Sequence, residues 1–151
     1  MPLVVFTNGC FDLLHPGHID LLERARALGD KLIVGINSDT SVRSIKGEGR
    51  PVMNQSDRKT VLESLRAVDE VIIFDELTPE NLIRNLKPDI LVKGGDWKPN
   101  EIVGSDYVLA DGGEVISVPL LGEYSTSKIV NSIYCRLWVF RNNCCGSRSD
   151  F

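Results

Sequence analysis

Short apolar runs alternate with segments of helical spacing along most of the chain. The apolar runs predict strands at residues 3–7, 31–36, 70–74, 89–93 and 114–118. The segments between and after them predict helices at residues 17–28, from 54–56 to 68, at 79–86, at 105–110 and from 125 to 133. The strand runs are continuously apolar, which is typical of strands buried on both faces. We therefore expect an α/β fold with a doubly wound, parallel, five-stranded sheet and helices on both faces.

Ligands of such sheets bind at the carboxyl ends of the strands, near the point where strand order reverses. The loops after Thr7, Ile36, Phe74, Lys93 and Val118 are therefore the places where function is expected. The predicted elements form one domain at residues 1–133. The remaining segment, residues 134–151, differs in composition, and its role as a docking helix, an oligomer contact or a foreign extension stays open.

Composition and charge exclude some classes of partner. The formal net charge is −4, so the chain as a whole does not attract nucleic acid or an anionic membrane. Its apolar runs fall short of the roughly 20 residues that span a bilayer, and the apolar start is too short for a signal peptide. A cytoplasmic location is expected. The four cysteines lack the spacing of a metal site and are interpreted as free thiols: Cys10, Cys135, Cys144 and Cys145.

The loop after the first predicted strand carries the clearest chemistry. It contains His15 and His18, three residues apart at the start of a predicted helix, where free N–H groups and the helix dipole favour anions. Gly9 and Gly17 leave the backbone open to phosphate oxygens. The alternative is a tight turn in which the histidines are incidental. Because the loop follows a buried strand and opens a helix, we favour a phosphate site.

This His-x-Gly-His segment resembles the signature of the cytidylyltransferase-like nucleotidyltransferase superfamily, which has a Rossmann-like fold. Residues 3–133 are also similar to one of its families, the D-glycero-β-D-manno-heptose 1-phosphate adenylyltransferases, in the form that stands alone without a heptose kinase domain. The similarity is carried by residues 34–39, 46–52, 91–97 and 122–127. It implies transfer of AMP from ATP to that heptose 1-phosphate, giving pyrophosphate and ADP-heptose for lipopolysaccharide or related glycans.

The resemblance also implies roles for individual residues. The catalytic residues are expected to be His15, His18 and Lys46. The nucleotide is expected to contact Thr7, Asn8, Gly9, Phe11, Asp12, Gly17, Lys93, Gly95, Asp96, Ser125 and Thr126. The substrate phosphate is expected to contact Lys46, Arg50 and Arg58. Mg²⁺ is expected to arrive with ATP, without direct protein ligands, and the enzyme is expected to be a homodimer.

Several of these residues also have structural interpretations. Lys46 and Arg50 lie in a predicted glycine-rich loop, which could be an ordinary solvent-exposed loop that binds no ligand. Arg58 could be a surface cation of a helix. Asp12 either orients a histidine, holds Mg²⁺ through water or forms an Asx-turn. Residues 93–97 could be a simple β-turn. Ser125 or Thr126 could be only a helix N-cap, although both roles are compatible.

Other functions remain open at this point. The chain lacks the P-loop pattern of ordinary NTPases and the Gly-x-Gly-x-x-Gly pattern of simple NAD enzymes. A cytidylyltransferase that uses CTP and an alcohol phosphate such as glycerol 3-phosphate would share the same loop chemistry. A non-catalytic nucleotide-binding module and a pure interaction domain are the alternatives from other classes.

Overall fold

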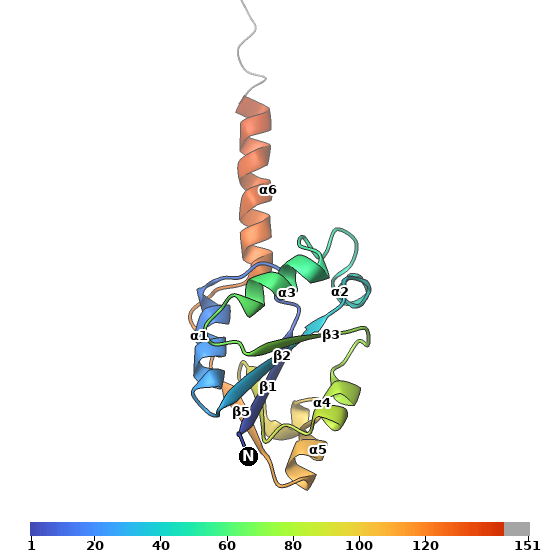
Figure 1. Ribbon diagram of the computed structural model, residues 1–151. Coiled ribbons are helices and arrows are strands. Elements are labelled where there is room, and N and C mark those ends of the chain that lie inside the picture. The colour runs from blue at the N-terminus through green and yellow to red at the C-terminus, as the bar shows by residue number, and fades with distance from the viewer. Residues whose placement is uncertain (144–151) are drawn as a thin grey trace, which may run out of the picture.

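The computed structural model describes residues 1–143 of the 151-residue chain (Figure 1). Its strands are β1 (Val4–Gly9), β2 (Lys31–Asn37), β3 (Glu70–Phe74), β4 (Ile90–Gly94) and β5 (Glu114–Val118). Its helices are α1 (Pro16–Arg26), α2 (Asp39–Lys46), α3 (Gln55–Glu63), α4 (Glu80–Leu86), the 3₁₀ turn η1 (Pro99–Glu101), α5 (Ser105–Ala110) and α6 (Thr126–Asn143). The five predicted strands are therefore present, with shifts of one or two residues at their ends.

The strands form one parallel sheet in the order β3-β2-β1-β4-β5. The chain winds outward from β1 through β2 to β3, then crosses back to β4 beside β1 and continues to β5. Strand order therefore reverses between β1 and β4, and the carboxyl ends of these two strands mark the expected ligand site. The predicted fold class is confirmed.

The sheet separates two apolar clusters because successive residues of a strand face opposite sides. On one face, α1 and α3 contribute Leu22 and Leu62 to a cluster that includes Leu32 of β2. On the other face, Ile83 of α4 and Val108 of α5 pack with a cluster that includes Ile33, the next residue of β2. Helices thus cover both faces, which explains why the strand sequences are apolar throughout.

Helix α2 was not predicted, and it changes the position of Lys46. Ser38 caps the helix by accepting a hydrogen bond from the Ser41 N–H at 3.2 Å. Within this eight-residue helix Val42 is the one large apolar side chain that is buried, so its sequence has too little apolar periodicity to indicate a helix. Lys46 is the last helical residue, and the glycine-rich loop begins only at Gly47.

Helix α6 continues through residue 133, where the domain was expected to end. Figure 1 shows it extending away from the sheet, and four of its large apolar side chains are exposed: Ile133, Tyr134, Leu137 and Trp138. Cys10 and Cys135 are free thiols, whereas Cys144 and Cys145 lie outside the described residues. Among the helices of residues 1–143, none has both the length and the apolar character that crossing a membrane requires.

Candidate active site

The loop between β1 and α1 places both histidines at a helix start. His15 is the N-cap residue of α1, Pro16 is its first residue, and the His18 N–H donates to the His15 carbonyl at 2.9 Å. The proline suits this position because it lacks the N–H that a first helical residue cannot use within the helix. No side chain caps this end of α1 by a hydrogen bond within the described residues. The His18 and Ile19 N–H groups both point back to the His15 carbonyl, so the Gly17 N–H is the group of this first turn that remains available to an anion.

The two imidazole rings are stacked. Their centroids are 3.7 Å apart and their planes differ by 16°. Phe11 supports His18 from within the protein, with ring centroids 5.0 Å apart. This buried phenylalanine has a φ of 46°, in the left-handed region that bulky residues rarely adopt. Such backbone strain persists only where surrounding contacts impose it, and here it places an aromatic ring beside His18.

Burial keeps both histidines neutral at pH 7. It lowers the pKa of His18 to about 4, with a further contribution from the neighbouring His15. Burial also lowers the pKa of His15. The Nδ1 atoms of both rings are buried without a hydrogen-bond partner in the described part of the chain. Two neutral imidazoles that line the same cavity are suited to contact a phosphoryl group that enters the site.

The lowered pKa of His18 predicts a pH-dependent stability. The unfolded chain takes up a proton on His18 below about pH 6.5, whereas the folded chain resists protonation until about pH 4. The free energy of unfolding should therefore fall as pH falls through this window, by at most about 1.4 kcal/mol per pH unit for one proton. Urea unfolding at several pH values measures this slope. His18→Gln should flatten it, and an equal slope in this variant and the wild type would contradict the interpretation.

The histidines line a cavity of about 290 Å³ at the carboxyl end of β1. Three segments that are distant in sequence form its wall. They are the loop after β1, the cations Lys46 and Arg50, and residues 120–127 with the start of α6. The structure therefore brings together nine of the predicted site residues, namely Phe11, Asp12, His15, Gly17, His18, Lys46, Arg50, Ser125 and Thr126.

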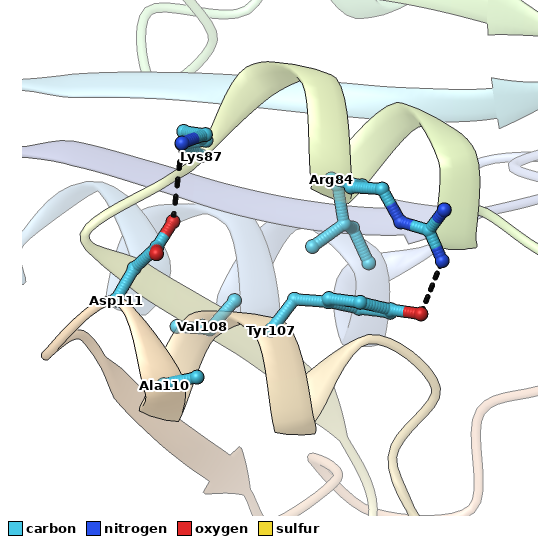
Figure 2. Close-up of a pocket in the computed structure, with 7 residues that line it drawn as sticks. Arg84, Lys87, Tyr107, Val108, Ala110 and Asp111 are labelled. Atoms are coloured by element: carbon cyan, nitrogen blue, oxygen red, sulfur yellow. Dashed lines mark hydrogen bonds and ion pairs between the residues drawn. The ribbon is translucent and has the colours of Figure 1, made fainter.

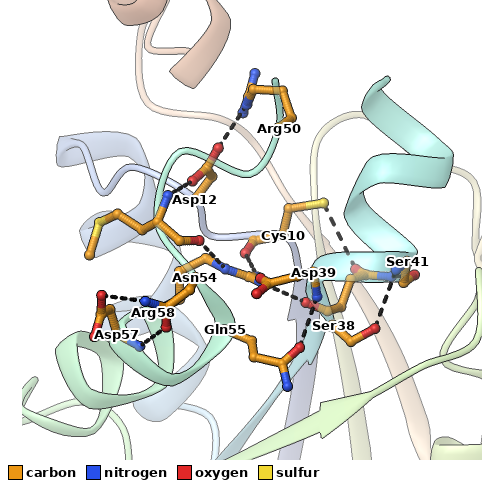
Figure 3. A network of polar contacts seen from close by, with 12 residues as sticks. Cys10, Asp12, Ser38, Asp39, Ser41, Arg50, Asn54, Gln55, Asp57 and Arg58 are labelled. Atoms are coloured by element: carbon orange, nitrogen blue, oxygen red, sulfur yellow. Dashed lines mark hydrogen bonds and ion pairs between the residues drawn. The ribbon is translucent and has the colours of Figure 1, made fainter. Parts of the chain in front are cut away.

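Asp12 holds the loop that carries Arg50 (Figure 3). Its carboxylate accepts hydrogen bonds from Arg50 Nε at 2.7 Å and from the N–H groups of Val52 and Met53 at 2.8 and 2.9 Å. Burial raises the pKa of Asp12, but the two backbone hydrogen bonds and Arg50 outweigh it, and the pKa is lowered overall. Asp12 thus orients Arg50 and the loop after Gly49. None of the hydrogen bonds of its carboxylate goes to a histidine, so the expectation that Asp12 orients a histidine is corrected.

The expectation that Arg58 contacts a substrate phosphate is wrong in this structure. Its side chain is fully buried, so it is neither a phosphate ligand nor a surface cation. Figure 3 shows its guanidinium among backbone carbonyls and a carboxylate. It donates to Met53 O at 3.0 Å, Cys10 O at 2.7 Å, Asn37 O at 2.8 Å and Asp39 Oδ1 at 2.9 Å. Arg58 therefore joins the segments that follow β1 and β2.

The ends of β1 and β4 meet beside the histidine cavity. Lys93 Nζ lies 3.4 Å from Asn8 Oδ1, and burial lowers the pKa of Lys93. Thr7 is fully buried, and its hydroxyl oxygen has no hydrogen-bond partner among the described residues. Gly9 is close to Phe11, because a Cβ on Gly9 would come within 3.0 Å of the Phe11 ring. Thr7 and Gly9 thus lie at the end of β1, directly before the loop that carries the histidines, and Lys93 lies beside them on β4.

The segment after β4 lies outside the lining of this cavity. Gly95 has a φ of 115°, and its N–H donates to Val118 O at 2.8 Å. Trp97 folds back so that its Nε1 donates to Gly94 O at 3.0 Å, and Asp96 is exposed. The backbone bends at Gly95 and Asp96, and the predicted nucleoside contacts of these two residues stay predictions.

Ser125 caps the start of α6, and the phosphate contacts of Ser125 and Thr126 stay predictions. Ser125 Oγ accepts a hydrogen bond from the Lys128 N–H at 3.3 Å, which is a helix cap, and both residues line the histidine cavity. Thr126 Oγ1 donates to Leu13 O at 3.1 Å and ties the start of α6 to the loop after β1. Tyr124, just before them, also lines the cavity, and sequence reasoning assigned it no role. The sequence signal that could have placed Tyr124 at the site is its position directly before the Ser-Thr pair.

Two further observations concern metal ligands and a second cavity. The part of the chain that the structure describes contains no group of three His, Cys, Asp or Glu residues placed to bind a metal ion. A second cavity of about 200 Å³ lies between α4 and α5 (Figure 2), and its charged groups are paired with their neighbours. Lys87 lies 3.8 Å from Asp111, and the Arg84 guanidinium lies over the Tyr107 ring at 4.4 Å.

Comparisons with known proteins find relatives that match most of the chain. Residues 6–132 match the cytidylyltransferase-like family. The chain is 53% identical over 127 residues to the bifunctional protein HldE of Azorhizobium caulinodans and 55% identical over 130 residues to that of Pseudomonas syringae pv. syringae. These matches cover 84% and 86% of this chain but only 26% and 27% of the relatives, so the chain spans about a quarter of their length.

Solved structures show the same fold. A lipopolysaccharide core biosynthesis protein from Thermoplasma volcanium aligns with a TM-score of 0.66 and 27% identity, over 83% of this chain and all of that chain. A pantothenate synthetase from Thermus thermophilus aligns with a TM-score of 0.55 at 18% identity, over 82% of this chain and 57% of that chain. The second likeness concerns the fold alone.

Proposed function

The chain belongs to the cytidylyltransferase-like family, and from this we propose that it transfers AMP from ATP to D-glycero-β-D-manno-heptose 1-phosphate. The products are pyrophosphate and ADP-heptose for lipopolysaccharide or related glycans. The observation that supports this most is the stacked His15–His18 pair at the start of α1, in one cavity with Lys46 and Arg50. The similarity to HldE proteins supports the choice of ATP and heptose 1-phosphate over CTP and an alcohol phosphate.

The reaction needs little proton transfer. A phosphate oxygen of the sugar 1-phosphate is already anionic at neutral pH, so it attacks the α-phosphorus of ATP without a strong general base. The bond to the β-phosphate breaks on the opposite side, and pyrophosphate leaves. The protein contributes positioning and charge stabilisation. His15 and His18 donate to the phosphoryl oxygens, and the exposed ammonium of Lys46 neutralises charge between the two substrates.

Mg²⁺ enters with ATP and is part of that substrate. The site suits an ion held by triphosphate oxygens and water, since the Asp12 carboxylate already accepts hydrogen bonds from Arg50, Val52 and Met53. Ser125 and Thr126 lie at the start of α6 in the same cavity, where hydroxyl and N–H groups suit the β- and γ-phosphates. Arg50, oriented by Asp12, is the second cation for the sugar phosphate.

The direct test measures pyrophosphate release from protein, Mg²⁺, nucleotide and sugar phosphate. We expect release with ATP and heptose 1-phosphate, and at most slow release with CTP or with glycerol 3-phosphate as acceptor. Faster turnover with CTP and glycerol 3-phosphate would replace the proposal by the cytidylyltransferase alternative. Tight nucleotide binding without pyrophosphate release from any acceptor would replace it by a non-catalytic module.

Gly17→Ala should separate activity from stability. A Cβ at this position would lie 3.2 Å from the His15 ring and 3.3 Å from Tyr124 Cβ, so these neighbours must shift by a few tenths of an ångström. Alanine is also the better helix former, so thermal unfolding should stay at or above the wild-type temperature. Turnover should fall by roughly tenfold through misplacement of His15. Wild-type turnover in a stable variant would show that this spacing is unimportant.

We further propose that the enzyme is a cytoplasmic homodimer. A cytoplasmic location suits ATP as substrate. A self-contact is supported by the exposed apolar side chains of α6, which are Ile133, Tyr134, Leu137 and Trp138. Light scattering should give twice the mass of one chain, and deletion of the residues after Tyr134 should lower it if α6 forms the contact. A monomeric full-length chain would contradict the dimer.

A further inference from the structure

Tyr124 extends the stacked histidines by a third ring. Its ring centroid lies 6.0 Å from that of His15, and the two planes differ by only 18°. The His15 ring in turn lies 3.7 Å from His18 at 16°. Three nearly parallel rings therefore follow one another along the wall of the phosphate cavity. Tyr124 is about half exposed, so its ring is held by neighbours at the cavity rather than by burial in a core.

The chain around Tyr124 is arranged to bring it to His15. Gly122 has a φ of 57°, a left-handed turn that glycine adopts without strain, and it redirects the chain after β5. Thr126, two residues after Tyr124, donates to Leu13 O in the loop that carries His15. Gly17 leaves the space between them, because a Cβ there would contact both the His15 ring and Tyr124 Cβ. Two independent segments thus meet at this contact.

We propose that Tyr124 is a positioning residue for His15. Its ring restricts the tilt of the imidazole and keeps it against His18, so that both rings meet the same phosphoryl group. Aromatic contacts of this kind stabilise an arrangement by about 0.5–1.5 kcal/mol, which corresponds to roughly 2- to 12-fold in an equilibrium or rate. The role needs the ring of Tyr124 and does not need its hydroxyl.

The effect on turnover rests on the proposed adenylyl transfer, whereas the effect on the His15 ring does not. The test therefore compares three variants by two readouts. Tyr124→Leu keeps apolar bulk and removes the ring, and Tyr124→Phe keeps the ring. Tyr107→Leu makes the same change at a tyrosine of α5 that lines the second cavity and not the histidine cavity, and it serves as the matched control.

The first readout is the proton NMR spectrum of the histidine rings without substrate. The chain has two histidines, so His18→Gln assigns the His15 signals directly. Tyr124→Leu should shift and broaden the His15 Hε1 and Hδ2 signals, because the neighbouring ring current and the restraint are lost. Tyr124→Phe and Tyr107→Leu should leave them at wild-type positions. Unchanged His15 signals in Tyr124→Leu would overturn the proposal.

The second readout is the rate of pyrophosphate release. Tyr124→Leu should lower kcat by about 3- to 10-fold with KM for ATP within about twofold, and Tyr124→Phe should restore wild-type turnover. A loss confined to KM, or an equal loss in Tyr124→Phe, would contradict positioning through the ring. If the wild type releases no pyrophosphate while the His15 signals respond as expected, the proposed reaction fails and the positioning role stands.

Discussion

Replacing His18 with alanine should lower kcat for pyrophosphate release by about 100- to 1,000-fold, the cost of removing one well-placed donor from a transition state. Phe11 and His15 pack against His18 and hold its ring in the site. Its low pKa makes it a neutral donor at pH 7 rather than a resident cation. The donor is therefore in place before charge develops on the phosphoryl oxygens.

Two controls separate this loss from a loss of structure. His18→Ala should bind ATP with an affinity within about tenfold of wild type, since the helix N-terminus and the cations remain. His18→Gln keeps a side-chain donor and should lose less activity than the alanine variant. Near-normal turnover of His18→Ala would show that His18 does not act on the reacting phosphates.

The sheet could be predicted from the sequence because its signal is local. Strands β3 and β5 lie at the expected residues, 70–74 and 114–118, because continuously apolar runs between turn residues are typical of buried strands. The His15–His18 pair was equally readable, because a strand, a glycine loop and a helix start adjoin in sequence. Helix α2 was missed because most of its side chains are polar or exposed.

The roles that sequence reasoning misjudged depend on distant partners. Asp12 accepts hydrogen bonds from Arg50, Val52 and Met53, which lie 38 to 41 residues away in the sequence. No local sequence pattern indicates such contacts. Tyr124 meets His15 only because α6 begins beside the loop after β1. Arg58 was taken for an exposed or ligand-binding cation because buried arginines are rare, and only the fold reveals the carbonyls around it.

Arg58→Met should cause the largest loss of stability of any substitution considered, about 3–5 kcal/mol in the free energy of unfolding. The methionine fills part of the volume but donates no hydrogen bond. Asp39 would then lose its cation, and the carbonyls of Met53, Cys10 and Asn37 would lose a donor. Arg58 is fully buried and the Asp39 side chain is 24% exposed, so the variant leaves a partly desolvated carboxylate without its cation.

Urea unfolding with Arg66→Met as the matched control measures this effect. Arg66 lies shortly after α3 and is exposed, so its replacement should change the free energy of unfolding by less than about 0.5 kcal/mol. Arg58→Lys should recover only part of the loss, because one ammonium cannot reproduce the planar fork that reaches four acceptors. Equal stability of Arg58→Met and Arg66→Met would show that the buried network does not hold the loops together. With the network lost, the loops after β1 and β2 should also separate, so any folded fraction of Arg58→Met should bind ATP more weakly than Arg66→Met.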